Sequence, residues 1–551
     1  MRPSLLAKCV VFCTLTIIAV SSQAEVMLQW FETEWDEMYR RMPVAAEVGY
    51  DYIWTPPPTK APTGLGTKWG NVGYSLYDRF DLGDVPQRGS WVTRYGSRGS
   101  LRSMVNAAHG LDVKIIPDIV MNHNGNGPDI RYYPGMKPED FHLQWSPGYV
   151  NTLNYQRAPR MTCWDVGGGY GCTMWQDLAS LIDIRTEPDD RFTGGANTPG
   201  WNFVAGANFI RHVGQYDRYP YTYTNETARE MLYRWVTWLG NAMDYDGLRL
   251  DAGKHTPWEF FGSYDDQRFL HQAQWNFGQR QGFSNSGYPG EVFQNYIVRK
   301  DALIFAEILS YWDELKYWYG YSGGNDRCPM RFLDYQMKKN ADQSFNGDLS
   351  KCGIFGADFG ANNGILYVYG HDEDGPGKKR LAYAYILTHV GFPMVYFTGN
   401  NLSWSDSGRG PSYKTWMIPG FDSYALGASS PDVANMVWVH QQFARASERK
   451  VWDNDGDFFA LERYDDKDSN GADAGDGILI AALNDSGGDM TKTVNTLFDP
   501  GTVLKDYSVF GRGEVTVDAS RNITINVPGN GGEGWSFYAP KIADPVRASV
   551  K

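Results

Sequence analysis

Gly247-Leu-Arg249-Leu-Asp251-Ala-Gly-Lys254-His255 is the stretch that decides the fold of this 551-residue chain. It is a run of strand length that ends on a carboxylate, and Arg249 and Asp251 share one face because they are two residues apart. The pattern recurs in order along the chain, in Asp118-Ile-Val-Met-Asn122-His123, Phe305-Ala-Glu307-Ile-Leu and Gly370-His371-Asp372. Carboxylates at several strand ends are typical of the catalytic face of a (β/α)8 barrel.

The remainder of the first 400 residues favours the same architecture. Strand-like runs alternate with amphipathic stretches such as 227–243, which opens with the capping-box sequence Thr227-Ala-Arg-Glu230. We expect eight strands, at 26–31, 52–54, 113–119, 247–250, 303–305, 331–333, 365–369 and 394–397. Unbroken alternation favours a closed barrel over an open sheet, so we predict an α/β fold built on a (β/α)8 TIM barrel.

Two further regions interrupt and follow the barrel. The segment between the third strand and the next helix, rich in Gly, Pro, Tyr and Trp, is too long for an ordinary connection. We therefore expect a barrel at 25–122 and 225–430, with an inserted irregular domain at 123–224. A helical run at 431–449 precedes short alternating stretches at 458–464, 477–483, 514–517 and 523–527. They predict a C-terminal antiparallel β-sandwich within 431–545.

Composition excludes some classes of partner. The chain is 42% hydrophobic and 21% charged, as globular proteins are. Its net charge is −13 and it has no long basic run, whereas nucleic acids and anionic membranes attract basic surfaces. We therefore expect neither nucleic acid nor an anionic membrane as a partner. We also expect the protein to be a monomer.

The N-terminus resembles a secretory signal peptide. Arg2 and Lys8 precede an apolar run at 10–20, and Ser22-Gln23-Ala24 resembles a cleavage site. We therefore predict a signal peptide at 1–24 and a secreted or periplasmic protein.

Removal of that peptide would leave four cysteines in an oxidising compartment, and four cysteines allow three pairings. Local loops favour the disulfides Cys163–Cys172 and Cys328–Cys352 among them. A zinc site is the alternative, although no CxxC pair or nearby histidine supports it.

Asp251 and Glu307 are the residues that we expect to carry the chemistry. The guanidinium of Arg249 would lower the pKa of Asp251 and keep it ionised, as a nucleophile requires. Glu307 ends the next strand, about 5 Å away, and retaining glycosidases hold their two carboxyl groups roughly 5–5.5 Å apart. Asp251 would thus attack an anomeric carbon while Glu307 protonates the leaving oxygen.

Other polar residues at the strand ends are expected to bind the sugar. Asp372 would lie across the cleft and accept hydrogen bonds from ring hydroxyls that strengthen in the transition state. His123 and His371 adjoin the acidic residues and would donate hydrogen bonds to hydroxyls, although capped core histidines are the alternative. We place Asp118 in the same substrate-binding set.

These segments resemble the motifs of the α-amylase family, retaining barrel enzymes that act on α-glucosidic bonds. The likeness covers most of 26–445 and includes three more stretches: Gly49-Tyr-Asp-Tyr-Ile-Trp-Thr-Pro-Pro57, Val72-Gly-Tyr74 with Tyr77-Asp-Arg-Phe-Asp-Leu-Gly83, and Leu381-Ala-Tyr-Ala-Tyr-Ile-Leu-Thr388. The resemblance implies the roles given above for the three acids. It adds Tyr74 as a stacking platform at the cleaved sugar, and Lys254 and His255 on the leaving-group side.

The resemblance also implies a Ca²⁺ ion. Asn122, Asp177, Asp183 and the His255 carbonyl resemble the family's ligands, and a set made only of oxygens suits Ca²⁺. The ion would tie the inserted domain to the barrel. The alternative is that Asp177 and Asp183 are exposed loop residues.

Three features depart from the family pattern. Gly370 stands where many members have Asn, segment 189–224 has no counterpart in the shorter members, and Thr398-Gly-Asn400 replaces a more usual acidic ending. The resemblance implies a secreted endo-acting α-amylase that cleaves α-1,4 bonds of starch- or glycogen-type glucans. An exo-acting maltooligosaccharide-forming amylase and a 4-α-glucan transglycosylase stay open. A glucan-binding protein without activity is disfavoured because all three acids are present.

Overall fold

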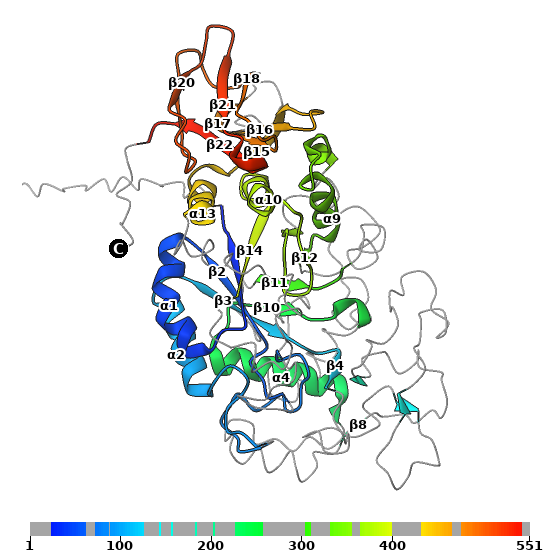
Figure 1. Cartoon of the computed structure of the whole chain (residues 1–551). Coiled ribbons are helices and arrows are strands. Elements are labelled where there is room, and N and C mark those ends of the chain that lie inside the picture. Colours follow the sequence, from blue (N-terminus) through cyan, green and yellow to red (C-terminus); the bar gives the residue numbers. More distant parts are fainter. Residues whose placement is uncertain are drawn as a thin grey trace, which may run out of the picture.

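Eight parallel strands close into a barrel in the order β1-β14-β13-β12-β11-β10-β3-β2 (Figure 1). The computed structural model describes residues 24–61, 72–87, 89–125, 143–144, 156–157, 182–184, 202–203, 226–256, 303–309, 331–354, 364–398, 431–465 and 475–542. The barrel strands are β1 (Met27–Phe31), β2 (Tyr52–Thr55), β3 (Lys114–Ile119), β10 (Gly247–Leu250), β11 (Leu303–Ala306), β12 (Arg331–Leu333), β13 (Gly364–Leu366) and β14 (Phe392–Thr398). The predicted (β/α)8 barrel is confirmed.

One strand is shorter than expected. The run predicted at 365–369 pairs as a strand only to Leu366. The Tyr367 hydroxyl donates to Glu373 Oε2 at 2.8 Å, and the Gly370 N–H donates to the Glu373 carbonyl at 3.1 Å. These bonds close residues 367–373 into a loop at the carboxyl end of β13.

The barrel interior holds apolar side chains from every barrel strand except β10, and the acidic residues of the site lie at or just after the carboxyl ends of the strands. The interior cluster comprises Met27, Tyr52, Trp54, Ile116, Leu303, Phe305, Leu333, Ile365, Tyr367, Phe392 and Met394. Outside the barrel, α1 (Trp35–Val48), α2 (Arg98–His109), α4 (Ala228–Met243), α9 (Tyr335–Ser344) and α10 (Lys379–Ile386) follow strands in the alternation that the sequence predicts.

Helix α2 illustrates why these segments are helical. Ser97 and Ser100 form a reciprocal capping box that satisfies backbone N–H groups at its start. Its buried residues, Leu101, Met104, Val105 and Ala108, recur at a spacing of three or four and give the helix one apolar face toward the barrel.

The helix predicted at 431–449 ends early. Helix α13 spans Asp432–Phe443, and strand β15 (Ser447–Trp452) takes the remaining residues. Ala446 has a φ of 61°, a left-handed conformation that interrupts a helix. The Arg463 side chain donates to the Ala446 carbonyl at 2.6 Å and to the Ser447 carbonyl at 3.1 Å, so it holds this turn.

The C-terminal part is antiparallel, as predicted. One sheet has the order β15-β16-β17-β22-β19-β20, and β18 and β21 form a second. Beyond β15 their bounds are β16 (Phe458–Asp465), β17 (Asp476–Asn484), β18 (Met490–Asn495), β19 (Val503–Asp506), β20 (Glu514–Thr516), β21 (Asn522–Val527) and β22 (Gly534–Pro540). Both sheets contribute to one buried cluster that includes Phe458, Ile480 and Ile525, which is the core of a sandwich.

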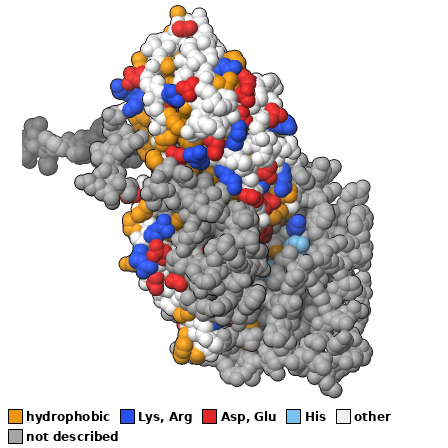
Figure 2. Space-filling model, viewed as in Figure 1, with side chains coloured by type: hydrophobic (Ala, Val, Ile, Leu, Met, Phe, Trp, Pro, Cys, Tyr) orange, Lys and Arg blue, Asp and Glu red, His pale blue; other side chains and the backbone are white. Residues whose placement is uncertain are grey.

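The sandwich packs against the barrel through α10 and α13 (Figure 1). Asn435 of α13 donates to the Tyr507 carbonyl at 3.0 Å, and Lys378, just before α10, lies 3.1 Å from Asp485. Figure 2 shows acidic and basic side chains interspersed over the sandwich.

Of the predicted inserted domain, the structure describes only short paired segments. They are β4 (His123–Asn124) with β7 (Ile182–Asp183), β5 (Leu143–Gln144) with β6 (Gln156–Arg157), and β8 (Asn202–Phe203) with β9 (Glu226–Thr227). Asp177, Cys163, Cys172 and Cys328 lie outside the described residues, whereas Cys352 is buried. The disulfide pairings stay predictions. Among the helices described, none is long and apolar enough to cross a membrane.

Candidate active site

Strand register places the acidic residues side by side. Parallel pairing sets Leu250 of β10 opposite Ala306 of β11, so Asp251 and Glu307 leave neighbouring strands at the same level. The backbone confirms this alignment, since the Glu307 N–H donates to the Leu250 carbonyl at 2.9 Å. On the other side, Arg249 pairs with Asp118 of β3.

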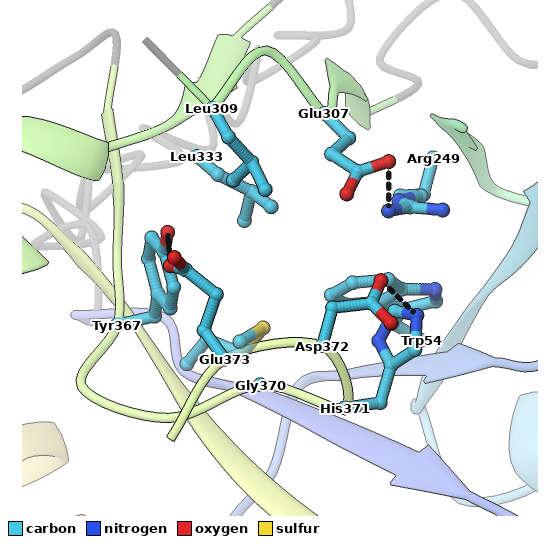
Figure 3. Close-up of a pocket in the computed structure, with 11 residues that line it drawn as sticks. Trp54, Arg249, Glu307, Leu309, Leu333, Tyr367, Gly370, His371, Asp372 and Glu373 are labelled. Carbon is cyan, nitrogen blue, oxygen red and sulfur yellow. Dashed lines mark hydrogen bonds and ion pairs between the residues drawn. The ribbon is translucent and has the colours of Figure 1, made fainter. Parts of the chain in front are cut away.

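Arg249 connects three carboxyl groups. Its Nη1 lies 2.8 and 2.9 Å from the two oxygens of Asp118 and 2.5 Å from Asp251 Oδ1. Its Nη2 lies 2.8 Å from Glu307 Oε2, the ion pair drawn in Figure 3. The guanidinium is 1% exposed, so these contacts form in a low dielectric and fix the relative positions of the three acids.

The surroundings of Asp251 raise its pKa, contrary to the expectation that Arg249 would lower it. Burial raises the pKa of Asp251 well above its ordinary value; Arg249 lowers it, and Glu307 and Asp118 raise it further. The prediction that Arg249 sets a low pKa for Asp251 is therefore wrong in its net direction. One guanidinium facing three buried carboxyl groups leaves the cluster with excess negative charge, which favours retention of a proton.

Asp118 positions its neighbours. It is buried, and its Oδ2 accepts from the Tyr74 hydroxyl at 2.6 Å and from Trp54 Nε1 at 3.1 Å, besides its two contacts with Arg249. Burial raises its pKa, and Arg249 opposes the shift. The described contacts of this carboxylate are thus to protein groups that line the site. Its contact with substrate stays a prediction.

His371 and Asp372 follow β13 and face Glu307 across a pocket (Figure 3). His371 Nε2 lies 2.9 Å from Asp372 Oδ2, and the Asp372 side chain is 56% exposed. Burial in the crowded site raises the pKa of Asp372, but the nearby His371 outweighs it and the net pKa is lowered. Asp372 is therefore ionised and open to a ligand.

Tyr74 and His123 lie beside His371 and Asp251 in the site. The Tyr74 ring stacks on His371 with centroids 5.2 Å apart and planes at 3°. His123 Nε2 lies 3.1 Å from the Tyr74 carbonyl and 3.9 Å from Asp251 Oδ2. The structure thus brings together seven residues singled out in the sequence: Tyr74, Asp118, His123, Arg249, Asp251, Glu307 and His371, with Asp372 at their edge.

The sequence analysis missed three polar residues of this site, Gln29, Tyr367 and Glu373. Glu373 and Tyr367 line the pocket together with the apolar Leu309, Leu333 and Met394, within about 260 Å³ of open space. Gln29 of β1 contacts His371 from the side of the barrel interior. The signal for Gln29 was present, because it is a polar residue in the middle of the apolar run 26–31.

Lys254 and His255 lie on the short helix η4 (Gly253–His255), directly after the left-handed residue Ala252. The Ala252 N–H donates to Glu307 Oε2 at 2.9 Å, so this strained turn also positions Glu307. Both predicted residues therefore lie beside the acids. Their contact with substrate stays a prediction.

The predicted calcium ligands converge in part. Asn122 Oδ1 accepts from Thr256 Oγ1 at 3.1 Å, next to His255, and the Ile184 N–H donates to the Asn122 carbonyl at 2.7 Å. Strand pairing sets Asp183 opposite His123. Asn122 Nδ2 has no hydrogen-bond partner within the described residues. Three of the four expected ligands thus lie on adjoining segments, whereas Asp177 lies outside the description.

A closed (β/α)8 barrel with paired carboxyl groups at the carboxyl ends of adjacent strands is the architecture of a glycoside hydrolase. The family described as "Alpha amylase, catalytic domain" matches residues 35–355, more than half of the chain. The chain belongs to the α-amylase family. It is therefore a glycoside hydrolase that acts on glucans.

Individual relatives agree with this assignment. The chain is 24% identical to an alpha-amylase of Bacillus licheniformis over 67% of its length and 70% of that protein. It is 27% identical to an alpha-amylase of Geobacillus stearothermophilus, over 67% of the chain and 65% of the relative. A cytoplasmic alpha-amylase of Escherichia coli is 26% identical over 42% of the chain and 47% of the relative.

Solved structures share the fold. A Geobacillus thermoleovorans alpha-amylase complexed with acarbose has a TM-score of 0.56 at 15% identity, covering 94% of this chain and 99% of that one. A gamma-CGTase from an alkalophilic Bacillus clarkii has a TM-score of 0.57 at 15% identity, covering 94% and 71%.

Proposed function

We propose that this protein is a secreted endo-acting α-amylase that hydrolyses α-1,4-glucosidic bonds of starch- or glycogen-type glucans with retention of anomeric configuration. One observation carries the proposal: Asp251 and Glu307 lie at the same level on adjacent strands and share one guanidinium. Strands that pair directly lie about 5 Å apart, the separation that suits a nucleophile and an acid, and it leaves no room for an intervening water.

The contacts of the two carboxyl groups suit Asp251 to act as the nucleophile and Glu307 to act as the acid. Asp251 Oδ1 is bound to Arg249, whereas Oδ2 lies 3.9 Å from His123 and is the oxygen that would attack the anomeric carbon. The described contacts of Glu307 are both made by Oε2, so the proton that the cluster retains would lie on Glu307 Oε1, which leaves Asp251 ionised for the attack. As the Asp251–sugar bond forms, the glycosidic bond breaks and its oxygen takes the Glu307 proton.

The second step restores the enzyme. Ionised Glu307 takes a proton from water, the oxygen of that water bonds to the anomeric carbon, and the Asp251 ester bond breaks. Asp372, ionised and half exposed, would accept hydrogen bonds from ring hydroxyls as positive charge develops on the sugar. Tyr74 and His371 would border the same sugar, and Lys254 and His255 the leaving group.

One relative supports an alternative outcome on the same scaffold. A relative 24% identical to the chain, from Bacillus sp., is named a glucan 1,4-alpha-maltohexaosidase. Exo action releasing one oligosaccharide is therefore a second candidate. Transfer to a sugar hydroxyl is the other alternative that the sequence leaves open. They share the first chemical step and differ in how the glucan and acceptor are held.

The product distribution distinguishes these candidates. In a time course of soluble-starch digestion we expect an early spread of oligosaccharide lengths released as α-anomers, because an open cleft admits internal bonds and two displacements retain configuration. Chromatography resolves the lengths and polarimetry or NMR the anomer. One dominant length from the first minutes would establish exo action, and β-anomers would contradict the assigned roles of Asp251 and Glu307.

We also propose that a Ca²⁺ ion joins the insert to the barrel through Asn122, Asp177, Asp183 and the His255 carbonyl. Two contacts support it: Asn122 accepts from Thr256, the residue after His255, and Asp183 pairs with His123, the residue after Asn122. Removal of Ca²⁺ by chelation should lower the free energy of unfolding by about 3–4 kcal/mol, for an ion present at 100 to 1,000 times its Kd. Calorimetry with EDTA, followed by Ca²⁺ or Mg²⁺, measures it. An unchanged Tm, or equal rescue by both ions, would contradict the site.

Export is part of the same proposal and is supported by the basic, apolar and small-residue pattern of residues 1–24. One relative is named cytoplasmic, so family membership alone leaves the compartment open. N-terminal sequencing of the protein recovered from the culture medium should begin at Glu25. Retention of Met1 would contradict cleavage.

A further inference from the structure

Gln29 is a buried polar residue that contacts the site from within the barrel. It lies in the middle of β1, is 1% exposed, and its Nε2 lies 2.6 Å from His371 Nδ1. Its Oε1 has no hydrogen-bond partner in the part of the chain that the structure describes. A buried amide that makes one short contact to a site histidine calls for an explanation beyond packing.

The ring of His371 is held in one orientation. Phe31 stacks on it at 4.5 Å and 30°, Tyr74 at 5.2 Å and 3°, and the edge of Trp54 approaches at 5.6 Å and 84°. With the ring fixed, its two nitrogens have fixed partners. Nδ1 faces Gln29, and Nε2 lies 2.9 Å from Asp372 Oδ2, as Figure 3 shows for the second contact.

These partners determine the tautomer. An ionised carboxylate carries no hydrogen, so Nε2, the ring nitrogen in close contact with it, must be the protonated one. In a neutral imidazole Nδ1 is then an acceptor and needs a donor, which the Gln29 amide N–H supplies. The opposite orientation of the amide would place Oε1 at Nδ1 and would require a second ring proton.

We propose that Gln29 is a positioning residue that fixes the Nε2–H tautomer of His371 and thereby orients Asp372 toward the sugar. The inference rests on the proposed glucan hydrolysis for its effect on rate, but its structural part concerns the free enzyme. Gln29 donates to His371 Nδ1, the protonated Nε2 of His371 lies against Asp372 Oδ2 as an ion-pair contact, and Asp372 keeps Oδ1 for the sugar hydroxyls. No other described residue donates to His371 Nδ1.

Gln29→Met removes the donor while keeping the length of the side chain. We expect kcat to fall about ten- to a hundredfold, as for the loss of partners that orient an active-site group. KM should change less than about threefold, because Gln29 does not face the pocket. Met27→Leu on the same strand face is the matched control and should leave kcat within about twofold of wild type.

Gln29→Glu separates positioning from packing through the pH profile. A carboxylate at residue 29 accepts only, so Nδ1 must carry a proton, and contact with Asp372 then needs both ring nitrogens protonated. The groups that face His371 are Asp372 on its own loop, Asp118 of β3 and Tyr74 of the loop after β2. We expect activity to be kept at low pH and the alkaline limb of kcat to move to lower pH. Equal losses in both variants with an unchanged profile would overturn the proposal.

Nitrogen NMR of the ¹⁵N-histidine-labelled full chain tests the tautomer without substrate. The His371 signals, assigned through a His371→Gln variant, should show a protonated Nε2 and an unprotonated Nδ1 in the wild type. In Gln29→Met this pattern should weaken or average. A protonated Nδ1 in the wild type would overturn the inference even if starch is cleaved as proposed. Conversely, an inactive wild type with the expected signals would refute the proposed function and leave the tautomer assignment standing.

Discussion

Asp251→Asn is expected to lower kcat for α-1,4-glucan cleavage by about 10⁴-fold or more, the scale of loss when a catalytic nucleophile is removed. An amide keeps the shape of the side chain and its Oδ1 can still accept from Arg249, but it cannot attack the anomeric carbon. KM should change less than about threefold because the sugar-binding contacts remain. Initial rates on a maltooligosaccharide of defined length measure both constants.

Asp246→Asn is the matched control. Asp246 immediately precedes β10, at the opposite end of the strand from Asp251, and accepts from the Ile115 N–H and His109 Nε2, both at 2.8 Å. The same substitution there should cost stability while kcat stays within about threefold of wild type. If Asp251→Asn kept more than a tenth of wild-type kcat in a folded protein, Asp251 would not be the nucleophile.

Arg249→Met is expected to lower the free energy of unfolding by about 3–5 kcal/mol at neutral pH and to abolish activity. The variant leaves Asp118, Asp251 and Glu307 without the cation that all three contact. Urea denaturation of wild type and variant measures the difference. Arg40→Met is the control, because Arg40 is 64% exposed and pairs with the neighbouring Glu37 of the same helix, and it should cost less than about 1 kcal/mol.

The cost of Arg249→Met should depend on pH. The pKa values of Asp118 and Asp251 are already raised by burial, and loss of Arg249 removes the effect that lowers them. A carboxyl group whose pKa is higher in the folded than in the unfolded chain destabilises the fold above its unfolded pKa. Protonation relieves the penalty as pH falls. The difference from wild type should therefore shrink between pH 7 and pH 5, and a constant or growing difference would contradict the shared ion pair.

The barrel could be predicted because its signals are local. Each strand is a short apolar run. An error of one or two residues in its predicted bounds still leaves the acidic residue at the end of the strand. Parallel pairing then brings Asp251 next to Glu307, whatever the connecting segments do. For the same reason the paired carboxyl groups were predictable from order and spacing alone.

Other features of the site and fold depend on tertiary contacts between residues that are far apart in the sequence. That Arg249 would contact three carboxyl groups, and that burial would outweigh it at Asp251, follows from how β3, β10 and β11 meet in the barrel. The end of α13 at Phe443 depends on Arg463, twenty residues away, which holds the Ala446 turn. Gln29 lies 342 residues from His371, and no local pattern links them.

Trapping of the glycosyl-enzyme tests the central claim most directly. A fluorinated α-maltosyl fluoride, which slows the second displacement more than the first, should add one glycosyl group to the protein, measured by intact mass. Peptide mapping should locate it on Asp251, and Glu307→Gln should not move it. An adduct on another residue, or turnover with β-anomeric product and no adduct, would contradict a retaining mechanism with Asp251 as nucleophile.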